Sequence, residues 1–566
     1  GVHGEHRRKR SGGWRLAALG LAFTGVAFAA ASAISGSGGQ ISGAALEVED
    51  FRRPVGVLEP SETGRLEWIA TLEKKQLTHC ALVDQSEPLL NLGPDRVQQG
   101  YNLIVFHQCP PTVVDMDGRV VYRYPSPAMR IHEAKLIPGG EGALMVLYQT
   151  YGSEWDYQAN PARTGNWSAT ETATGIGRLE PHGEFTWQCH ILDGTTSPHH
   201  SIEVLPNGNI LVIVFRRRPL EDCYARGISP HSNRARYSFH DVDAGCLDDG
   251  IIEYTPDCQV VWEWYSMDHM VQNFDASIAN FGSPHEHPEL LDANYDKFGH
   301  LNWTGVTSPT SFSQSHLNSI AYLPELDHIA MGSYMYDEVH IIDHAAPTEV
   351  MAGNSGGRYG VGGGLLYRYG NPQAYNPAAS WHDRKIDSLH GLNLIERGLE
   401  LNAGREGAPH LIMFNNGDEA EQAMMEGLPP PLTTGADEIE LPVDAAGVYT
   451  ADPDAIFSPA SWGPTEANWR YRSYNETEKS NVFGYAERQP NGNTLITVAV
   501  SDTLREVDAH GQLVWWYKNP FSSLPHQGHC ADDNCNLFWA MWRAYRVVAG
   551  SAEAHAFEHL SNRRFS

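Results

Sequence analysis

Histidines occur in three separate segments of the chain, each just before or within an apolar, strand-like run. The pair His199-His200 precedes Ile-Glu-Val-Leu, His316 precedes Leu-Asn-Ser-Ile, and His390 lies in Asp-Ser-Leu-His-Gly-Leu-Asn. A neutral imidazole is both a nucleophile and a proton shuttle near neutral pH. Histidines that converge from separate repeats therefore predict group-transfer chemistry.

The elements that would position these histidines are hairpins of one repeated kind. In each hairpin an apolar run leads to a turn of the Asp-x-x-Gly or Pro-Asn-Gly-Asn type, and a second apolar run follows, often with an aromatic residue at its end. The copies are 113–124, 179–187, 205–213, 254–264, 489–497 and 507–515. Asn-Gly and Asp-Gly between apolar runs are the strongest short hairpin signal, because type I′ turns need positive φ at both central positions.

Hairpins that recur in this way predict an all-β fold built from propeller blades. Their spacing exceeds the roughly 40–45 residues of a compact blade, so long insertions must lie between strands. Insertions that gather on one face of a scaffold usually build a site. A pair of β-sandwiches and an irregular all-β enzyme are the alternative architectures.

The composition excludes some classes of function. The 566 residues include 40 Lys or Arg against 69 Asp or Glu, a formal charge of −29. A nucleic-acid binder needs a basic footprint, so we predict no nucleic-acid partner and interpret the acidic surface as promoting solubility. The sequence contains no evident Gly-rich loop of the kind that cradles phosphate, and we predict no cofactor.

The N-terminus differs from this acidic pattern. Basic residues at 6–10 precede an apolar run that ends near Ser35, which is typical of either a signal peptide or a single membrane anchor through 14–35. Both alternatives predict that the remainder lies outside the cytoplasm. We assign 36–95 to a linker and irregular lead-in, 96–548 to the propeller and 549–566 to a C-terminal tail.

Eight cysteines, an even number, suit disulfides in an oxidising compartment. Cys530 and Cys535 flank a short polar loop and form the first predicted pair, and Cys223 with Cys246 forms the second. No cysteine spacing matches a structural zinc site. His285-Glu-His287 could chelate a metal, but Pro288 places it in a loop and we predict no metal site.

A series of ordered motifs resembles the arylsulfate sulfotransferase family, the donor-ester-dependent sulfotransferases of bacteria and related extracytoplasmic proteins. The resemblance covers about Gly100 to Arg546. It is carried by Val113-Val-Asp-Met-Asp-Gly, His199-His-Ser-Ile-Glu-Val-Leu-Pro-Asn-Gly-Asn, Val261-Trp-Glu-Trp, His316-Leu-Asn-Ser-Ile, Glu338-Val-His-Ile-Ile-Asp, Gly364-Leu-Leu-Tyr-Arg-Tyr-Gly-Asn-Pro, Phe414-Asn-Asn-Gly and Arg543-Ala-Tyr-Arg. The resemblance implies a six-bladed β-propeller with its active site in the central channel.

The resemblance also implies the reaction. A sulfuryl group would move from a phenolic sulfate ester to a phenolic acceptor through a sulfohistidine, without a nucleotide donor. His390 occupies the place of the nucleophile. His316 and Asn318 match a His-x-Asn pair that would bind the sulfuryl oxygens. His199 or His200 would bind sulfate or shuttle the phenolic proton.

The sequence departs from the family pattern at two positions. Tyr334 replaces the arginine expected after the His-x-Asn strand, and Gly391 replaces the aspartate that often follows the nucleophile. A guanidinium holds charge that a phenol cannot, so Arg368 or Arg384 would have to substitute. These departures motivate an alternative function, a catalytically weak or inactive propeller that serves as an extracytoplasmic binding module. Hydrolysis of sulfate esters is a third option.

Overall fold

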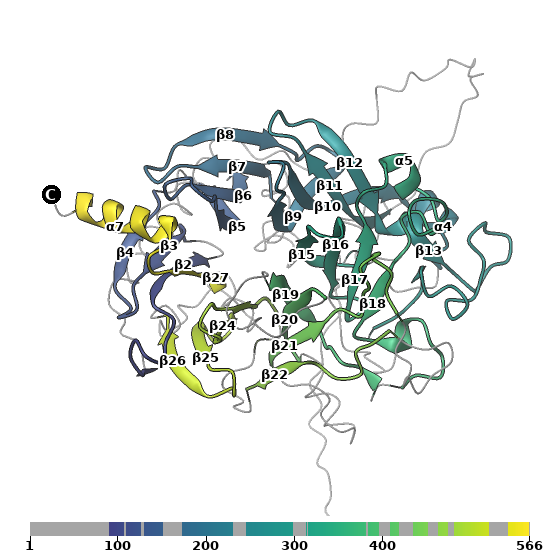
Figure 1. Cartoon of the computed structure of the whole chain (residues 1–566). Coiled ribbons are helices and arrows are strands. Elements are labelled where there is room, and N and C mark those ends of the chain that lie inside the picture. The colour runs from purple at the N-terminus through teal and green to yellow at the C-terminus, as the bar shows by residue number, and fades with distance from the viewer. Residues whose placement is uncertain are drawn as a thin grey trace, which may run out of the picture. The chain divides into compact units, whose positions relative to one another are not determined.

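The computed structural model in Figure 1 describes most of the chain from residue 90 onward. The described residues are 90–106, 109–125, 129–150, 173–229, 245–297, 313, 315–380, 383–395, 408–417, 434–450, 462–473, 480, 482–519 and 541–564. The predicted leader at 1–35, the lead-in up to 89 and the Cys530–Cys535 pair lie outside these ranges. None of the described helices is long and apolar enough to cross a membrane.

Six antiparallel sheets surround one axis in chain order, which confirms the six-bladed β-propeller (Figure 1). We number the blades from the N-terminus and give each from its inner to its outer strand. Blade 1 is β27 (Met541–Val548), β2 (Gly100–Phe106), β3 (Thr112–Val114) and β4 (Val120–Arg123). Blade 2 is β5 (Met129–Leu136), β6 (Leu144–Thr150), β7 (Gly175–Leu179) and β8 (Phe185–His190). Blade 3 is β9 (Thr196–Val204), β10 (Ile210–Pro219), β11 (Gly245–Tyr254) and β12 (Val260–Tyr265).

The second half of the chain repeats the arrangement. Blade 4 is β15 (Leu317–Leu323), β16 (His328–Ser333), β17 (Glu338–Asp343) and β18 (Tyr367–Tyr369). Blade 5 is β19 (Leu389–Ile395), β20 (His410–Asn415), β21 (Gly435–Glu440) and β22 (Trp469–Arg472). Blade 6 is β23 (Tyr485–Arg488), β24 (Thr494–Val498), β25 (Thr503–Val507) and β26 (Leu513–Lys518), with β1 (Leu90–Asn91) on its outer edge.

Smaller elements lie in the connections. Between blades 3 and 4 the chain forms the parallel pair β13 (Met270–Val271) and β14 (Leu291–Asp292). Short helices in the described connections include α4 (Leu220–Ala225), η4 (Ser266–His269), α5 (Thr348–Met351) and η6 (Pro372–Ala374). Residues assigned from sequence to a tail form helix α7 (Ala552–Arg564), whose Ala554 and Phe557 are buried.

The two ends of the described chain close the ring of blades. The C-terminal strand β27 is the inner strand of blade 1 and pairs with β2, with Leu103 opposite Tyr545. The strand β1 pairs with β26, with Leu90 opposite Trp516. β1 thus lies in the stretch assigned from sequence to the lead-in. Because the N-terminal strand pairs within blade 6 and the C-terminal strand pairs within blade 1, backbone hydrogen bonds tie both ends of the described chain into the ring.

The core lies between neighbouring blades rather than at one centre. Successive side chains on a strand point to opposite faces of its sheet. On β10, Leu211 and Ile213 pack toward blade 4, whereas Val212 and Val214 pack toward blade 2. Similar apolar clusters fill the other spaces between successive blades. Because both faces of each blade are buried, the inner strands are held in fixed positions around the axis.

The disulfide prediction is confirmed for one pair. Cys223 in α4 and Cys246 in β11 are bonded. This bond joins the helix after β10 to the neighbouring strand, within blade 3. Cys109 is also disulfide-bonded. Cys189 and Cys258 are free thiols.

Candidate functional site

Six aromatic and imidazole rings form a closed circuit at the N-terminal ends of the inner strands. Their centroids are 5.0 Å apart for His200 and His316, 5.5 Å for His316 and Tyr334, and 5.8 Å for Tyr334 and His390. The circuit continues at 6.2 Å to Phe483, 4.3 Å to Trp542 and 5.6 Å back to His200. Blades 3, 4, 5, 6 and 1 contribute members. The structure therefore brings together the three histidines that are far apart in sequence.

The orientation of His390 is fixed by Asn416, which follows β20. His390 Nδ1 lies 2.7 Å from Asn416 Oδ1, and Asn416 Nδ2 donates to the carbonyls of Ser480 at 2.6 Å and Phe483 at 2.8 Å. Because both carbonyls can only accept, the amide nitrogen must face them and the amide oxygen must face the imidazole. His390 therefore carries its proton on Nδ1, which leaves the lone pair on Nε2.

Burial keeps His390 neutral. The imidazole is 5% exposed, and burial lowers its pKa from 6.5 to about 4, with Arg543 and Lys297 adding to the effect. A neutral imidazole with a lone pair on a defined nitrogen is a nucleophile at neutral pH. From the sequence, the lack of an aspartate at Gly391 suggested that nothing would fix the tautomer of His390. The structure shows that the tautomer is nevertheless fixed. Asn416 takes that role from the neighbouring strand.

His316 is held by a buried carboxylate through its backbone. Asp249 Oδ2 accepts from the backbone N–H groups of Ser315 at 3.0 Å and His316 at 2.9 Å, and Oδ1 accepts from Leu317 at 3.0 Å. His316 has φ of 46°, in the left-handed region, so these three bonds stabilise a conformation that a side chain disfavours. Burial lowers the pKa of His316 to about 3 and raises that of Asp249 to about 7.

His199 and His200 have different surroundings. Nδ1 of His199 lies 2.6 Å from Nδ1 of His200, so one of the two donates to the other. The His199 ring stacks on Phe215 with centroids 3.4 Å apart, outside the circuit. Within the described residues His200 Nε2 is buried without a hydrogen-bond partner. Burial lowers the pKa of both rings. The sequence left the choice between the two open, and the structure places His200 in the circuit with His199 behind it.

Bulges interrupt the pairing of several inner strands at the end of the blades where the circuit lies. In five of them the pairing register shifts at the circuit end: β5 around His132, β9 at His199 to Ser201, β15 at Asn318, β19 after His390, and β27 at Trp542. An extra residue bends the strand and re-aims a side chain, and such bulges are frequent next to active sites. The bulges of β9, β19 and β27 lie at or beside the circuit members His200, His390 and Trp542.

Asn318 joins blades 4 and 5. Its Nδ2 donates to the carbonyl of Leu389 at 2.7 Å, directly before His390, and its Oδ1 accepts from Ser319 Oγ at 3.0 Å. The side chain is fully buried. The amide expected to bind sulfuryl oxygens thus already has a hydrogen-bond partner on each of its two polar atoms.

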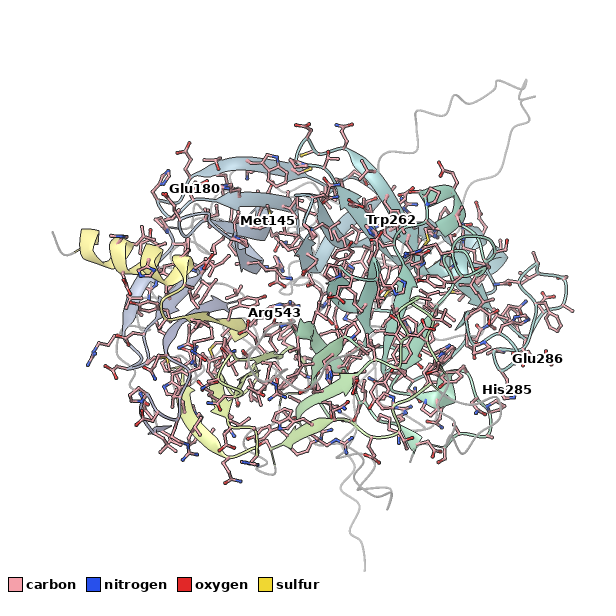
Figure 2. All side chains as sticks on the ribbon, viewed as in Figure 1. Met145, Glu180, Trp262, His285, Glu286 and Arg543 are labelled. Carbon is pink, nitrogen blue, oxygen red and sulfur yellow. A yellow bond between two sulfur atoms is a disulfide. The ribbon has the colours of Figure 1, made fainter. Side chains whose placement is uncertain are left out.

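Two cations lie near the rings. Lys297 Nζ is 3.9 Å from the centroid of Tyr334. Arg543 lies where the inner strands converge (Figure 2) and donates to Ser201 Oγ at 3.3 Å and to the carbonyl of Asn318 at 3.2 Å, in addition to its ion pair with Glu133. Positive charge on Arg543 lowers the pKa of His200 and His390. Neither cation was predicted from sequence, and only the Arg543-Ala-Tyr-Arg motif offered a signal.

The guanidinium predicted to replace the missing arginine is elsewhere. Arg368 lies on the outer strand β18, 0% exposed, where it pairs with Glu338 at 2.5 Å and donates to the carbonyls of Pro288 and Leu290. Every one of these partners is on the outer side of blade 4 or in the preceding connection. The described hydrogen bonds and ion pair of Arg368 therefore lie within blade 4 and the preceding connection.

The other candidates have described contacts with residues outside the circuit. Arg384 donates to Asp337 at 2.9 Å and to the hydroxyl of Tyr295 at 2.9 Å. Figure 2 shows His285 and Glu286 at the periphery, far from Arg543. Within the described residues no group of three or more His, Cys, Asp or Glu side chains could hold a metal.

Comparison with known proteins agrees with the motif series. The family model described as Arylsulfotransferase (ASST) matches residues 105–354, which confirms the resemblance over that part of the chain. No curated protein matches the chain. The matched family is one of arylsulfotransferases.

Solved structures share low identity with the chain. A protein of unknown function from Bacteroides caccae has 9% identity, with 74% of this chain and 93% of that chain covered and a TM-score of 0.35. Virginiamycin B lyase from Staphylococcus aureus has 9% identity, with 79% and 89% covered and a TM-score of 0.31. The β-propeller domain of Myceliophteria thermophila Cps50 (Swd1) has 10% identity, with 77% and 90% covered and a TM-score of 0.33. Likenesses this weak carry no inference about function.

Proposed function

We propose that this protein is a nucleotide-independent sulfotransferase in which His390 takes a sulfuryl group from an aryl sulfate and passes it to a phenol. The observation that carries the proposal is the hydrogen bond from His390 Nδ1 to Asn416, because it leaves Nε2 free to attack. The family match supports the reaction class. Phe483 and Trp542, which complete the circuit beside His390 and His200, supply apolar surface suited to an aryl group.

The transfer balances as two displacements at sulfur. In the first, the Nε2 lone pair of His390 forms a bond to sulfur while the bond from sulfur to the aryl oxygen breaks, and its electron pair leaves with the phenolate. The imidazole then carries a positive charge, which Asn416 Oδ1 stabilises through the Nδ1 proton. In the second, the oxygen of an acceptor phenol bonds to sulfur while the bond from sulfur to Nε2 breaks, and its electron pair returns to His390. The proton of the acceptor phenol passes to the histidine that protonated the leaving phenolate.

The leaving phenolate needs a proton, and we assign its supply to His200 or His316, the other two imidazoles of the circuit. Both imidazoles are neutral in the free protein, because burial lowers their pKa values. An aryl sulfate brings a negative charge, which raises the pKa of any imidazole beside it. Binding is therefore coupled to uptake of a proton, and the protonated ring donates to the leaving oxygen.

Two features favour an enzyme over a binding module. The departures at Tyr334 and Gly391 motivated the module, but Lys297 places a cation at Tyr334 and Asn416 orients His390. The cation is an ammonium rather than the guanidinium of the family pattern. We also propose that the protein acts outside the cytoplasm, which the Cys223–Cys246 disulfide supports.

The test is release of a coloured phenol from p-nitrophenyl sulfate with phenol as acceptor, together with intact-mass analysis of the quenched protein. We expect turnover and a transient gain of one sulfuryl group on the peptide that contains His390. His390→Ala should abolish both and keep the melting temperature. His132→Ala, which removes a buried histidine at the β5 bulge outside the circuit, is the matched control and should retain turnover. Equal phenol release by His390→Ala and the unaltered protein would exclude His390 as nucleophile.

A further inference from the structure

A buried ammonium lies against the ring that replaces the expected arginine. Lys297 Nζ is 3.9 Å from the ring centroid of Tyr334, and the lysine is 0% exposed. Lys297 follows β14 in the connection between blades 3 and 4, whereas Tyr334 directly follows β16. The Tyr334 ring is in turn a neighbour of both His316 and His390 in the circuit. The Tyr334 ring therefore lies between the Lys297 ammonium and His390, the proposed nucleophile.

The hydrogen bonds of Lys297 show how this charge can act. Nζ donates to the carbonyl of Tyr334 at 3.2 Å, to Asp337 Oδ1 at 2.8 Å and to Ser388 Oγ at 2.6 Å. An ammonium has three N–H groups, so these three acceptors use all of them. Lys297 therefore cannot donate to a sulfuryl group while these contacts stand. Its charge reaches the site through the Tyr334 ring.

We propose that Lys297 and Tyr334 act as a pair in place of the missing guanidinium, with Lys297 as a positioning residue that strengthens the Tyr334 phenol as a hydrogen-bond donor to the sulfuryl group. This inference rests on the proposed function. A cation at the face of an aromatic ring is attracted to it, and the attraction grows as the ring system gains negative charge. The pair is buried, so solvent screens it little.

The same ammonium ties the Tyr334 side of the site to the His390 side. Ser388, two residues before His390, has φ of 58° and donates its backbone N–H to Asp337 Oδ1 at 2.7 Å. Lys297 contacts the Ser388 hydroxyl and the same carboxylate oxygen. The cluster of Lys297, Asp337 and Ser388 thus holds the start of β19 against blade 4. It sets the separation between the Tyr334 and His390 rings.

The chain offers a matched control, because Asp337 has two cationic partners. Arg384 contacts Asp337 Oδ2 at 2.9 Å and has no described contact with the Tyr334 ring. Lys297→Met and Arg384→Met each remove one cation from the same carboxylate. Both variants therefore lose an ion pair with Asp337. Only Lys297→Met also loses the cation at the Tyr334 ring.

The experiment compares kcat and KM of both variants for aryl sulfates whose leaving phenols differ in acidity. Lys297→Met should lower kcat by about 10- to 100-fold with little change in KM, the size expected for a buried cation–π pair. Its rate should also fall more steeply as the leaving phenol becomes less acidic. Tyr334→Phe should show a similar loss, and the double variant should lose no more than either single variant. Arg384→Met should keep kcat.

The outcomes separate this inference from the proposed function. A kcat for Lys297→Met equal to that of Arg384→Met overturns the inference while the sulfotransferase proposal stands. If the unaltered protein shows no turnover, binding of inorganic sulfate measured by calorimetry replaces kcat as the readout. Weaker sulfate binding by Lys297→Met than by Arg384→Met then supports the inference, and equal binding overturns it. Melting temperatures of all variants show whether each one folds.

Discussion

Replacing Asn416 by leucine tests the central contact of the proposed site. The change keeps the approximate size of the side chain but removes the oxygen that accepts from His390 Nδ1 and the nitrogen that donates to Ser480 and Phe483. His390 then loses the partner that fixes its tautomer and ring orientation. We expect a large loss of kcat, because the imidazole must present Nε2 to sulfur and then carry positive charge.

The size of the loss follows from two effects. A hydrogen bond between neutral groups contributes about 0.5–1.5 kcal/mol and one to a charged group about 1.5–3 kcal/mol. The difference of about 1–1.5 kcal/mol, realised only as His390 becomes charged, corresponds to a factor of about 5–13 in rate. Loss of orientation adds a factor of about 10–100, as for partners that orient metal-bound histidines. Together these effects lower kcat by roughly two to three orders of magnitude.

The substitution also leaves the carbonyls of Ser480 and Phe483 without their donor, so the melting temperature must be measured together with kcat. Each buried carbonyl left without a donor costs about 1–3 kcal/mol. Asn415→Leu is the matched control, because Asn415 is equally buried and loses contacts with Asp437 and the Asp387 N–H but does not contact His390. Both variants should lower the melting temperature, and only Asn416→Leu should lower kcat in addition. Equal kcat values for the two variants would refute the proposed role of Asn416.

Burial holds the pKa of His390 at about 4 against 6.5 in the unfolded chain, so kcat/KM should keep its acidic limb near pH 4. Between pH 6.5 and 4 the unfolded chain binds more protons at this position than the folded chain, so the free energy of unfolding measured in urea should fall as the pH falls. Asp249→Asn places an amide against the backbone N–H groups that hold His316, and should lower kcat more than it lowers the melting temperature; a change in stability alone would contradict the positioning role. Arg368→Met leaves Glu338 without its guanidinium and should cost about 3–5 kcal/mol of stability in denaturant titrations, with kcat of the folded fraction unchanged.

The blades could be predicted from sequence because residues close together in the chain determine each hairpin. The Val507-Asp-Ala-His-Gly turn leads to Trp515, and the structure has Gly511 at φ of 76° and Trp515 fully buried between blades 6 and 1. Alternating apolar residues and turn chemistry depend on neighbours in the chain. Closure of the ring depends on pairing of β27 with β2 and of β1 with β26, strands far apart in the chain, and no local sequence pattern predicts this pairing.

The site could be predicted only in part, because its geometry comes from departures from regular pairing. The motif order located His200, His316 and His390, but not the bulges that turn β9 and β15 toward the axis. Bulges carry no strong signal in a single sequence. Long-range partners such as Lys297 and Arg543 come from other blades or connections, so spacing could not reveal them.

At Gly391 the sequence lacks the aspartate of the family pattern, and the structure shows a packing reason for the glycine. Its φ is 57°, and a Cβ added there would lie 2.6 Å from the carbonyl oxygen of Gly484 and 2.8 Å from Cα of Tyr485. An aspartate at this position would therefore clash with the backbone that leads into blade 6, whatever its use to His390. The close contact of Gly391 with Gly484 and Tyr485 leaves no room for a carboxylate side chain, and it brings the segment before blade 6 next to β19. The carbonyls of Ser480 and Phe483, in that same approach to blade 6, fix the Asn416 amide and so orient His390. Tight packing of blade 6 against blade 5 at Gly391 thus accompanies the contacts through which Asn416 orients His390, the proposed nucleophile.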